Sequence, residues 1–252
     1  METPRLSTGI CPAPPHSLHQ RAAAVCLLLA TLALAACETV PVATDGEANP
    51  ALERMISAGD WATLSTANIR CAAPGEACAK AHAAKGDACL RLAIQLPPSA
   101  SEKEARTREL LDCAEENYRN ALLLQPTTAA PSRESFHGGL LLTLSERRNR
   151  LDALARDKKL DRENEKLMMA AQNARREAAG SALGYLYGAS AHAYRAALMP
   201  TGRDRCNDLR QAEMLLGRSP SPPRELTDEQ ARITALVRAQ LRSNGCPRIV
   251  RR

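Results

Sequence analysis

Aromatic side chains are scarce in this sequence: one Trp, one Phe and four Tyr occur among 252 residues. β-Branched residues are also sparse, and these two classes pack best on the faces of strands. Ala, Leu, Arg and Glu, which favour helices, are abundant instead. A β-sandwich, a barrel and a doubly wound α/β enzyme are therefore disfavoured. The composition predicts an all-α fold, and 44% hydrophobic residues suffice for a packed core.

Sequence motifs that carry chemistry are missing as well. The chain contains no His-Glu-x-x-His, no Gly-x-Ser-x-Gly, no phosphate-binding glycine loop and no Cys-x-x-Cys-His. Beyond residue 36, the histidines are His82, His137 and His192, and each stands apart from other catalytic residue types. The sequence therefore predicts no catalytic residue, no cofactor and no small-molecule substrate, and we expect the protein not to be an enzyme.

The chain has a single long apolar run. Residues 22–36 carry no charge, no Pro and no Gly, and Arg5 and Arg21 precede them. The run is shorter than the ~20 residues that a membrane-spanning helix needs. A basic flank and a short apolar segment that ends in small residues predict a secretory signal. The alternatives are an uncleaved anchor and an apolar helix that arises by chance.

The end of this segment, Leu34-Ala35-Ala36-Cys37, resembles the lipobox of bacterial lipoproteins. The resemblance implies that residues 1–36 are a signal peptide and that the Cys37 thiol receives a diacylglycerol. It also implies that the new amino group is acylated after cleavage. The residue after the cysteine is Glu38 and not Asp. In the enterobacterial sorting pattern this implies the outer membrane, with the protein facing the periplasm.

Charge and composition divide the remaining chain. Residues 37–50 are polar, and we expect them to form a flexible tether. Residues 51–246 are expected to form a helical domain, and residues 247–252 a basic tail. Residues 37–200 contain 21 basic and 21 acidic side chains, whereas residues 201–252 contain 11 Arg and 6 acids, a net charge of +5. The positive charge of this end favours binding to anionic lipid head groups or to an acidic partner. The alternative is a solvated end whose arginines reflect a GC-rich genome, and no nucleic-acid partner is expected behind a secretory signal.

The nine cysteines divide by role. Cys11 and Cys26 leave with the signal, and Cys37 is the expected lipid site. An even number of cysteines remains, and the cell envelope oxidises thiols, so we predict three disulfides. The cysteines concerned are Cys71, Cys78, Cys89, Cys113, Cys206 and Cys246.

Helix geometry narrows the pairings. Cys78 and Cys89 fall on one expected helix, about 16 Å apart, which is too far for a bond. Cys89 and Cys113 are equally distant from position 101, inside the loop 97–102, so an antiparallel hairpin places them opposite each other. We therefore expect these two to pair.

The turn-forming residues 72–75 are able to bring Cys71 to Cys78. Cys206 and Cys246 then remain, near the outer ends of the last expected helix pair. Sequence alone leaves other pairings open.

A metal site is the competing interpretation of these cysteines. Cys71, Cys78, His82 and Cys89 form the pattern C-x6-C-x3-H-x6-C. Zinc sites favour about two to four residues between cysteines, so this spacing is not a standard one. No metal ligand is therefore predicted, and free buried thiols are a further alternative.

Apolar periodicity and helix-breaking residues predict the helices. Two short helices are expected to meet at Gly59-Asp60, with Asp60 capping the second, and Thr227 is expected to cap the last helix. Residues 140–179, which lack Gly and Pro, predict either one long helix or a hairpin that breaks near position 149 or 157. Residues 127–131 read as a linker. The other expected helices cover residues 76–96, 102–125, 181–199, 203–217 and 227–243.

Part of the chain is similar to tetratricopeptide repeats. Ala114-x3-Tyr118-x2-Ala121-x4-Pro126 resembles the second helix of that repeat, and Gly59-Asp60-Trp61 and Gly86-Asp87 resemble its inter-helix turn. The first-helix pattern is not matched and no strict period emerges, so an irregular helical bundle is the alternative.

The repeated hairpins, the missing catalytic motifs and the expected anchor together favour a non-catalytic scaffold that binds or assembles other envelope proteins. Tyr185, Tyr187 and Tyr194 share one expected helix and are candidate partner contacts. The second function considered is an envelope enzyme, or the regulatory subunit of one, with a site assembled from scattered residues.

Overall fold

The structure is a computed structural model that describes residues 50–71, 73–97, 101–125, 130–154, 158–200 and 202–246. These residues belong to one compact unit, Val40–Arg252. Their regular secondary structure is helical, which confirms the all-α prediction. No helix in the described ranges combines the length and the apolar character needed to cross a membrane.

The helices follow one another with short connections. Their bounds are α2 (Pro50–Ala58), α3 (Trp61–Thr66), α4 (Glu76–Gln95), α5 (Ser101–Leu124), α6 (Ala130–Leu154), α7 (Lys158–Glu177), α8 (Leu183–Leu198), α9 (Arg203–Arg218), the 3₁₀ turn η1 (Arg224–Leu226) and α10 (Thr227–Ser243).

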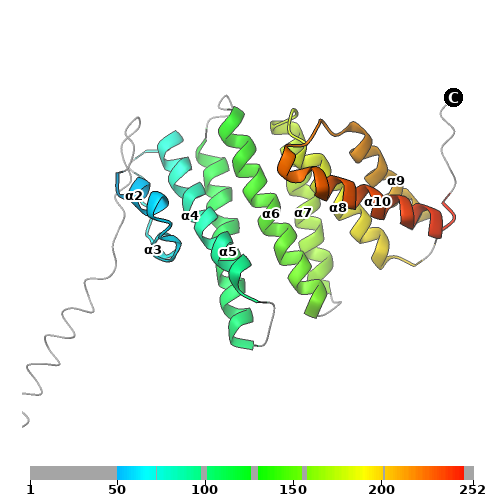
Figure 1. Cartoon of the computed structure of the whole chain (residues 1–252), viewed down its shortest axis with the longest axis horizontal. Coiled ribbons are helices and arrows are strands. Elements are labelled where there is room, and N and C mark those ends of the chain that lie inside the picture. The colour runs from blue at the N-terminus through cyan, green and yellow to red at the C-terminus, as the bar shows by residue number, and fades with distance from the viewer. Residues whose placement is uncertain are drawn as a thin grey trace, which may run out of the picture. The chain divides into compact units, whose positions relative to one another are not determined.

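Successive helices pack as antiparallel hairpins, as the sequence predicts (Figure 1). The hairpins are α4 with α5, α6 with α7, and α8 with α9. The first helices of successive hairpins also contact one another, because α4 touches α6, α6 touches α8 and α8 touches α10. The second helix of each hairpin also packs against the first helix of the next, α5 against α6 and α7 against α8, so the hairpins form one continuous stack. Helix α10 closes this stack against α8 and α9.

Local signals explain where the first helices begin and end. Gly59 has a φ of +67°, a conformation that favours glycine, and it forms the turn between α2 and α3. The Asp60 side chain accepts a hydrogen bond from the Thr63 backbone N–H at 3.1 Å, so the predicted cap is confirmed. Helix α4 ends at Gln95, before Pro97 and Pro98.

Residues 140–179 belong mostly to two helices, because α6 ends at Leu154 and α7 begins at Lys158. The expected hairpin that breaks near position 157 is therefore confirmed, and the single long helix is wrong. Two other expected boundaries are wrong. Helix α6 begins at Ala130, inside the expected linker. Pro131 is tolerated there because the first turn of a helix leaves its N–H groups unbonded. Thr227 is the first residue of α10 and not its cap, because η1 leads directly into the helix. Its Oγ1 instead donates to the Pro223 carbonyl at 3.4 Å.

Tyr118 sets the spacing of the first three long helices. Its side chain on α5 is 2% exposed and lies against Gly86 of α4 and Gly139 of α6. A Cβ atom on Gly86 would lie 3.2 Å from the ring, and one on Gly139 would overlap it. The Tyr118 hydroxyl donates to the Asp87 carboxylate, and burial raises the pKa of both groups.

Gly86-Asp87 lies inside α4, which spans Glu76–Gln95, and not at an inter-helix turn. This position corrects the expectation from the repeat resemblance.

The predicted disulfide pairs are confirmed. The Cα–Cα distances are 5.7 Å for Cys71–Cys78, 6.1 Å for Cys89–Cys113 and 5.5 Å for Cys206–Cys246. The bonds close sequence separations of 7, 24 and 40 residues. Loop-closure entropy then stabilises the fold by about 2, 3.5 and 4 kcal/mol in that order, because a longer loop costs the unfolded chain more freedom.

Replacing Gly139 by Ala tests the Tyr118 contact. We expect the free energy of unfolding to fall by about 3 kcal/mol, since the new methyl group displaces a ring that has no free space around it. Gly217→Ala is the matched control, because Gly217 is exposed on α9 and a Cβ there meets no atom within 4 Å. That change should be neutral or raise stability by up to ~1 kcal/mol. Urea unfolding measures both, and equal effects would contradict the close approach.

Candidate functional site

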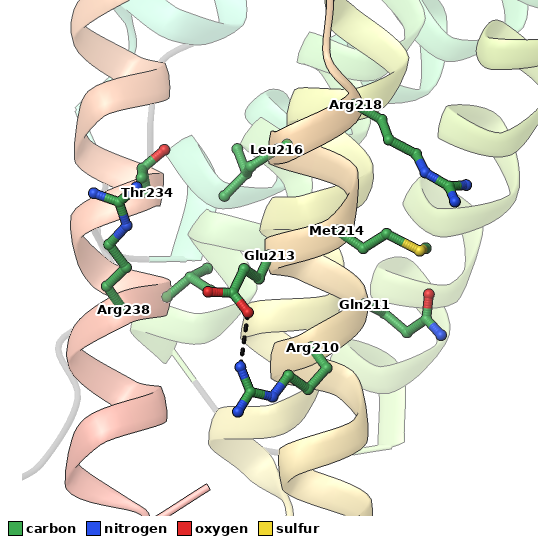
Figure 2. Close-up of a pocket in the computed structure, with 10 residues that line it drawn as sticks. Arg210, Gln211, Glu213, Met214, Leu216, Arg218, Thr234 and Arg238 are labelled. Carbon is green, nitrogen blue, oxygen red and sulfur yellow. Dashed lines mark hydrogen bonds and ion pairs between the residues drawn. The ribbon is translucent and has the colours of Figure 1, made fainter. Parts of the chain in front are cut away.

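A hollow of about 880 Å³ lies over α9 and α10 (Figure 2). Figure 2 shows Glu213 and Leu216 on the side of α9 that faces α10, and Met214 and Arg218 on its other side. The hollow therefore extends across the exposed face of α9. Its lining residues are Arg210, Gln211, Glu213, Met214, Leu216, Gly217, Arg218, Thr234, Val237 and Arg238.

Positive charge dominates this hollow. Three arginines and one glutamate line it, and Arg210 pairs with Glu213 through an Nη1–Oε2 distance of 2.8 Å. Arg218 and Arg238 are exposed and form no ion pair within the described part of the chain. Two uncompensated guanidinium groups are thus available to an anion.

Core packing and one disulfide hold the two helices that form the hollow. Their buried faces meet those of α8, while the polar faces point outward. The Cys206–Cys246 bond joins the start of α9 to the residue just beyond α10. The apolar residues concerned are Leu209, Ala212, Leu215, Ile233, Val237 and Leu241.

A second polar site lies where α8 meets α9. Asp208 is 4% exposed, and its Oδ1 lies 2.8 Å from His192 Nδ1. Arg195 donates from Nε to Oδ2 at 2.8 Å and from Nη2 to Oδ1. Burial by itself would raise the pKa of Asp208, but the hydrogen bonds from Arg195 and His192 outweigh burial and hold the pKa below its usual value.

His192 and Arg195 also line a smaller hollow of about 290 Å³ between α7 and α8. When His192 is neutral, its Nδ1–H donates to Asp208, so Nε2 carries the free lone pair. This arrangement is able to accept a proton or a hydrogen bond from a small ligand. The other lining residues are Glu165, Met168, Met169, Gln172, Arg175 and Gly188.

Sequence reasoning missed the role of Asp208. The residue shares the buried face of α9 with Ala212 and Leu215, at spacing i, i+4 and i+7. A carboxylate on an apolar stripe needs a buried partner. The position of Asp208 in this stripe was therefore the sequence signal that could have indicated a buried ion pair. The partner, His192, lies on another helix, so its identity required the fold.

The other two histidines also have partners. His137 is buried, its Nε2 lies 3.2 Å from Glu177, and desolvation lowers its pKa. His82 Nδ1 lies 2.8 Å from Asn117 Oδ1. One ligand atom from each of His82, Cys71 and Cys78 lies within 4.8 Å of the others. Each of the three histidines, although isolated from catalytic residue types in the sequence, therefore has a polar partner in the fold.

The three tyrosines proposed as partner contacts do not form one surface. Tyr187 is buried in the main core, which α4 to α8 build together, and burial raises its pKa to about 12. Tyr185 packs instead against the core between α8 and α10. The guanidinium of Arg148 lies 4.8 Å from the ring centre of Tyr194. Tyr187 is therefore a core residue, which corrects its expected role.

Cys37 and the basic tail 247–252 lie outside the described residues. The chain matches no protein-family model, no curated protein and no solved structure. Its function is therefore inferred from the residues and hollows above.

Replacing Asp208 by Asn should lower the free energy of unfolding at pH 7 by about 1–3 kcal/mol, because His192 and Arg195 lose a buried anionic partner. The pKa of Asp208 is lower in the folded state than its unfolded value of about 3.9. The stabilisation that the Asp208 carboxylate gives to the fold is therefore complete above pH ~3.9, the unfolded pKa, and is lost as the pH falls through the lower folded pKa.

Urea unfolding of both chains at several pH values measures this difference, which should shrink below pH ~4. Asp204→Asn on the exposed first turn of α9 is the control, and its effect should be small. A difference for Asp208→Asn that stays constant down to low pH would contradict the ion-pair assignment.

Proposed function

We propose that the chain is a lipid-anchored envelope protein with a non-catalytic binding role. Its helical stack binds an acidic segment of another envelope protein in the hollow over α9 and α10. The observation that carries this proposal is the excess of arginine in that hollow. These arginines belong to residues 201–252, which carry a net charge of +5, whereas residues 37–200 are neutral overall.

The stacking of the hairpins supports an interaction role. Contacts run from α4 to α6, from α6 to α8 and from α8 to α10, as in arrays whose units touch only their neighbours. Such arrays expose long surfaces and commonly bind other proteins.

The proposed anchor keeps this surface near a membrane. Residues 37–50 join the lipidated cysteine to the first described helix, and a chain of that length reaches at most about 45 Å. The three disulfides suit an oxidising compartment. The partner is therefore expected at or close to the periplasmic face of the outer membrane.

Replacing Cys37 by Ser tests the anchor. Membrane fractionation and mass spectrometry should find the unchanged chain in the membrane fraction, cut before Cys37 and acylated. The C37S chain should lack the acyl mass. Cys26→Ser is the control, because Cys26 lies in the proposed signal and should not affect acylation. A full-length, unmodified wild-type chain would contradict the lipoprotein assignment.

Reversing two charges tests the hollow. With a fluorescent acidic peptide as the probe, Arg218→Glu with Arg238→Glu should raise the Kd at least tenfold, and added salt should weaken wild-type binding. Arg106→Glu with Arg108→Glu is the matched control, because both arginines are exposed on α5. Equal losses in both variants, or binding to anionic vesicles in preference to the peptide, would contradict the proposal.

The partner is identified by crosslinking in cells. A photoreactive side chain at Met214, within the hollow, should capture one envelope protein. The same group at Leu123, which is 82% exposed on α5, should not capture it. The charge-reversed variant should lose the crosslink.

One observation favours the second function, an envelope enzyme or its regulatory subunit. The Asp208–His192 pair beside the smaller hollow has the geometry of an oriented general base. The residues that line this hollow include no Ser, Thr, Cys or Lys for the base to activate. The binding role is therefore the better supported of the two.

A further inference from the structure

We propose that reduction of the Cys71–Cys78 disulfide converts this pair, together with His82, into a binding site for a thiophilic metal ion such as Zn²⁺. The site is separate from the arginine-lined hollow and does not depend on its function. It would hold metal only in the reduced state, because a disulfide sulfur is not a thiolate ligand.

The three side chains already converge. One potential ligand atom from each of Cys71, Cys78 and His82 lies within 4.8 Å of the other two. Cys78 and His82 are one turn apart on α4, and Cys71 approaches from the segment before that helix. Zinc bonds of about 2.1–2.3 Å in a tetrahedral site separate the ligand atoms by about 3.5–4 Å. Only a small adjustment therefore separates the present arrangement from a metal site.

The orientation of His82 is set by a buried neighbour. The Asn117 Nδ2 donates to the Cys113 carbonyl at 2.8 Å, which leaves Asn117 Oδ1 as an acceptor. This oxygen lies 2.8 Å from His82 Nδ1, so the neutral ring carries its proton on Nδ1 and its lone pair on Nε2. Histidine ligands usually donate their second ring N–H to such a partner. Asn117 is 6% exposed and is therefore a positioning residue for this site.

Loss of the Cys71–Cys78 bond destabilises the fold least of the three. The bond closes the shortest loop, with a separation of 7 residues, so its loss frees the unfolded chain least. Cys71 is partly exposed, so a thiol reductant has access to this bond. Cys113, Cys206 and Cys246 are partly exposed as well, so the short loop, and not exposure, distinguishes the Cys71–Cys78 pair.

The chemistry requires a dithiol as the reductant. Its two thiols form a disulfide, and the two electrons and two protons that they lose convert Cys71 and Cys78 into thiols. Zn²⁺ then binds both sulfurs as thiolates and displaces the two protons to solvent. His82 supplies the third ligand, and a water molecule completes four-coordination.

Cobalt titration tests the site in the chain that begins at Cys37. After limited reduction by a dithiol under anaerobic conditions and removal of the excess reductant, Co²⁺ should give a thiolate-to-cobalt charge-transfer band that saturates at one equivalent. Zn²⁺ should abolish this band. The oxidised chain should give no band.

Matched variants separate this site from other thiols. His82→Ala and the Cys71→Ser/Cys78→Ser pair should each lose the band, and Asn117→Ala should weaken metal affinity at least tenfold. The Cys206→Ser/Cys246→Ser pair should retain the band. An unchanged band in His82→Ala, or its loss only in the Cys206→Ser/Cys246→Ser pair, would overturn the proposal.

Alkylation mapping gives a readout that needs no variant. In the partly reduced wild-type chain, mass spectrometry should find Cys71 and Cys78 alkylated, and Zn²⁺ should slow their alkylation at least tenfold. Circular dichroism should show unchanged helix content. Absence of protection by Zn²⁺, or equal protection of all reduced cysteines, would overturn the proposal.

Discussion

The ring of Tyr118 fills the space that side chains at positions 86 and 139 would occupy, and this close approach sets the distance between α4, α5 and α6. Only glycine permits two helix backbones to approach one tyrosine in this way. The main core continues from these helices to α8, and α8 also contributes to the second core with α9 and α10. The hollow over α9 and α10 therefore depends on a chain of contacts that begins at this tyrosine.

Arginine side chains connect the ends of neighbouring helices. Three buried or half-buried arginines donate to carbonyl groups at or just beyond the C-terminal ends of other helices, where few backbone donors remain. Arg150 bonds to the Ala93 carbonyl of α4 at 2.9 Å, and Arg133 to the Leu122 carbonyl of α5 at 3.0 Å. Arg205 bonds to Met199, just beyond α8. A positive charge at a helix C-terminus also compensates the helix dipole.

The two proposed sites lie on different parts of the fold and use different chemistry. The arginine-lined hollow belongs to the last hairpin and α10, and its charge suits an acidic polypeptide. The cysteine and histidine cluster belongs to the start of α4, and its soft ligands suit a metal ion. Loss of one site therefore leaves the other intact, which makes the two proposals separable by experiment.

The sequence by itself determined the helical class, most helix boundaries and the pairing of Cys89 with Cys113, because these follow from local periodicity and from the geometry of one hairpin. It also showed the arginine excess near the C-terminus. Only the tertiary structure decided that Asp208 meets His192, that Tyr187 is buried and that His82 approaches Cys71 and Cys78. These contacts join separate helices or a helix and a loop, and the rotation of one helix against another depends on the packing of the whole core.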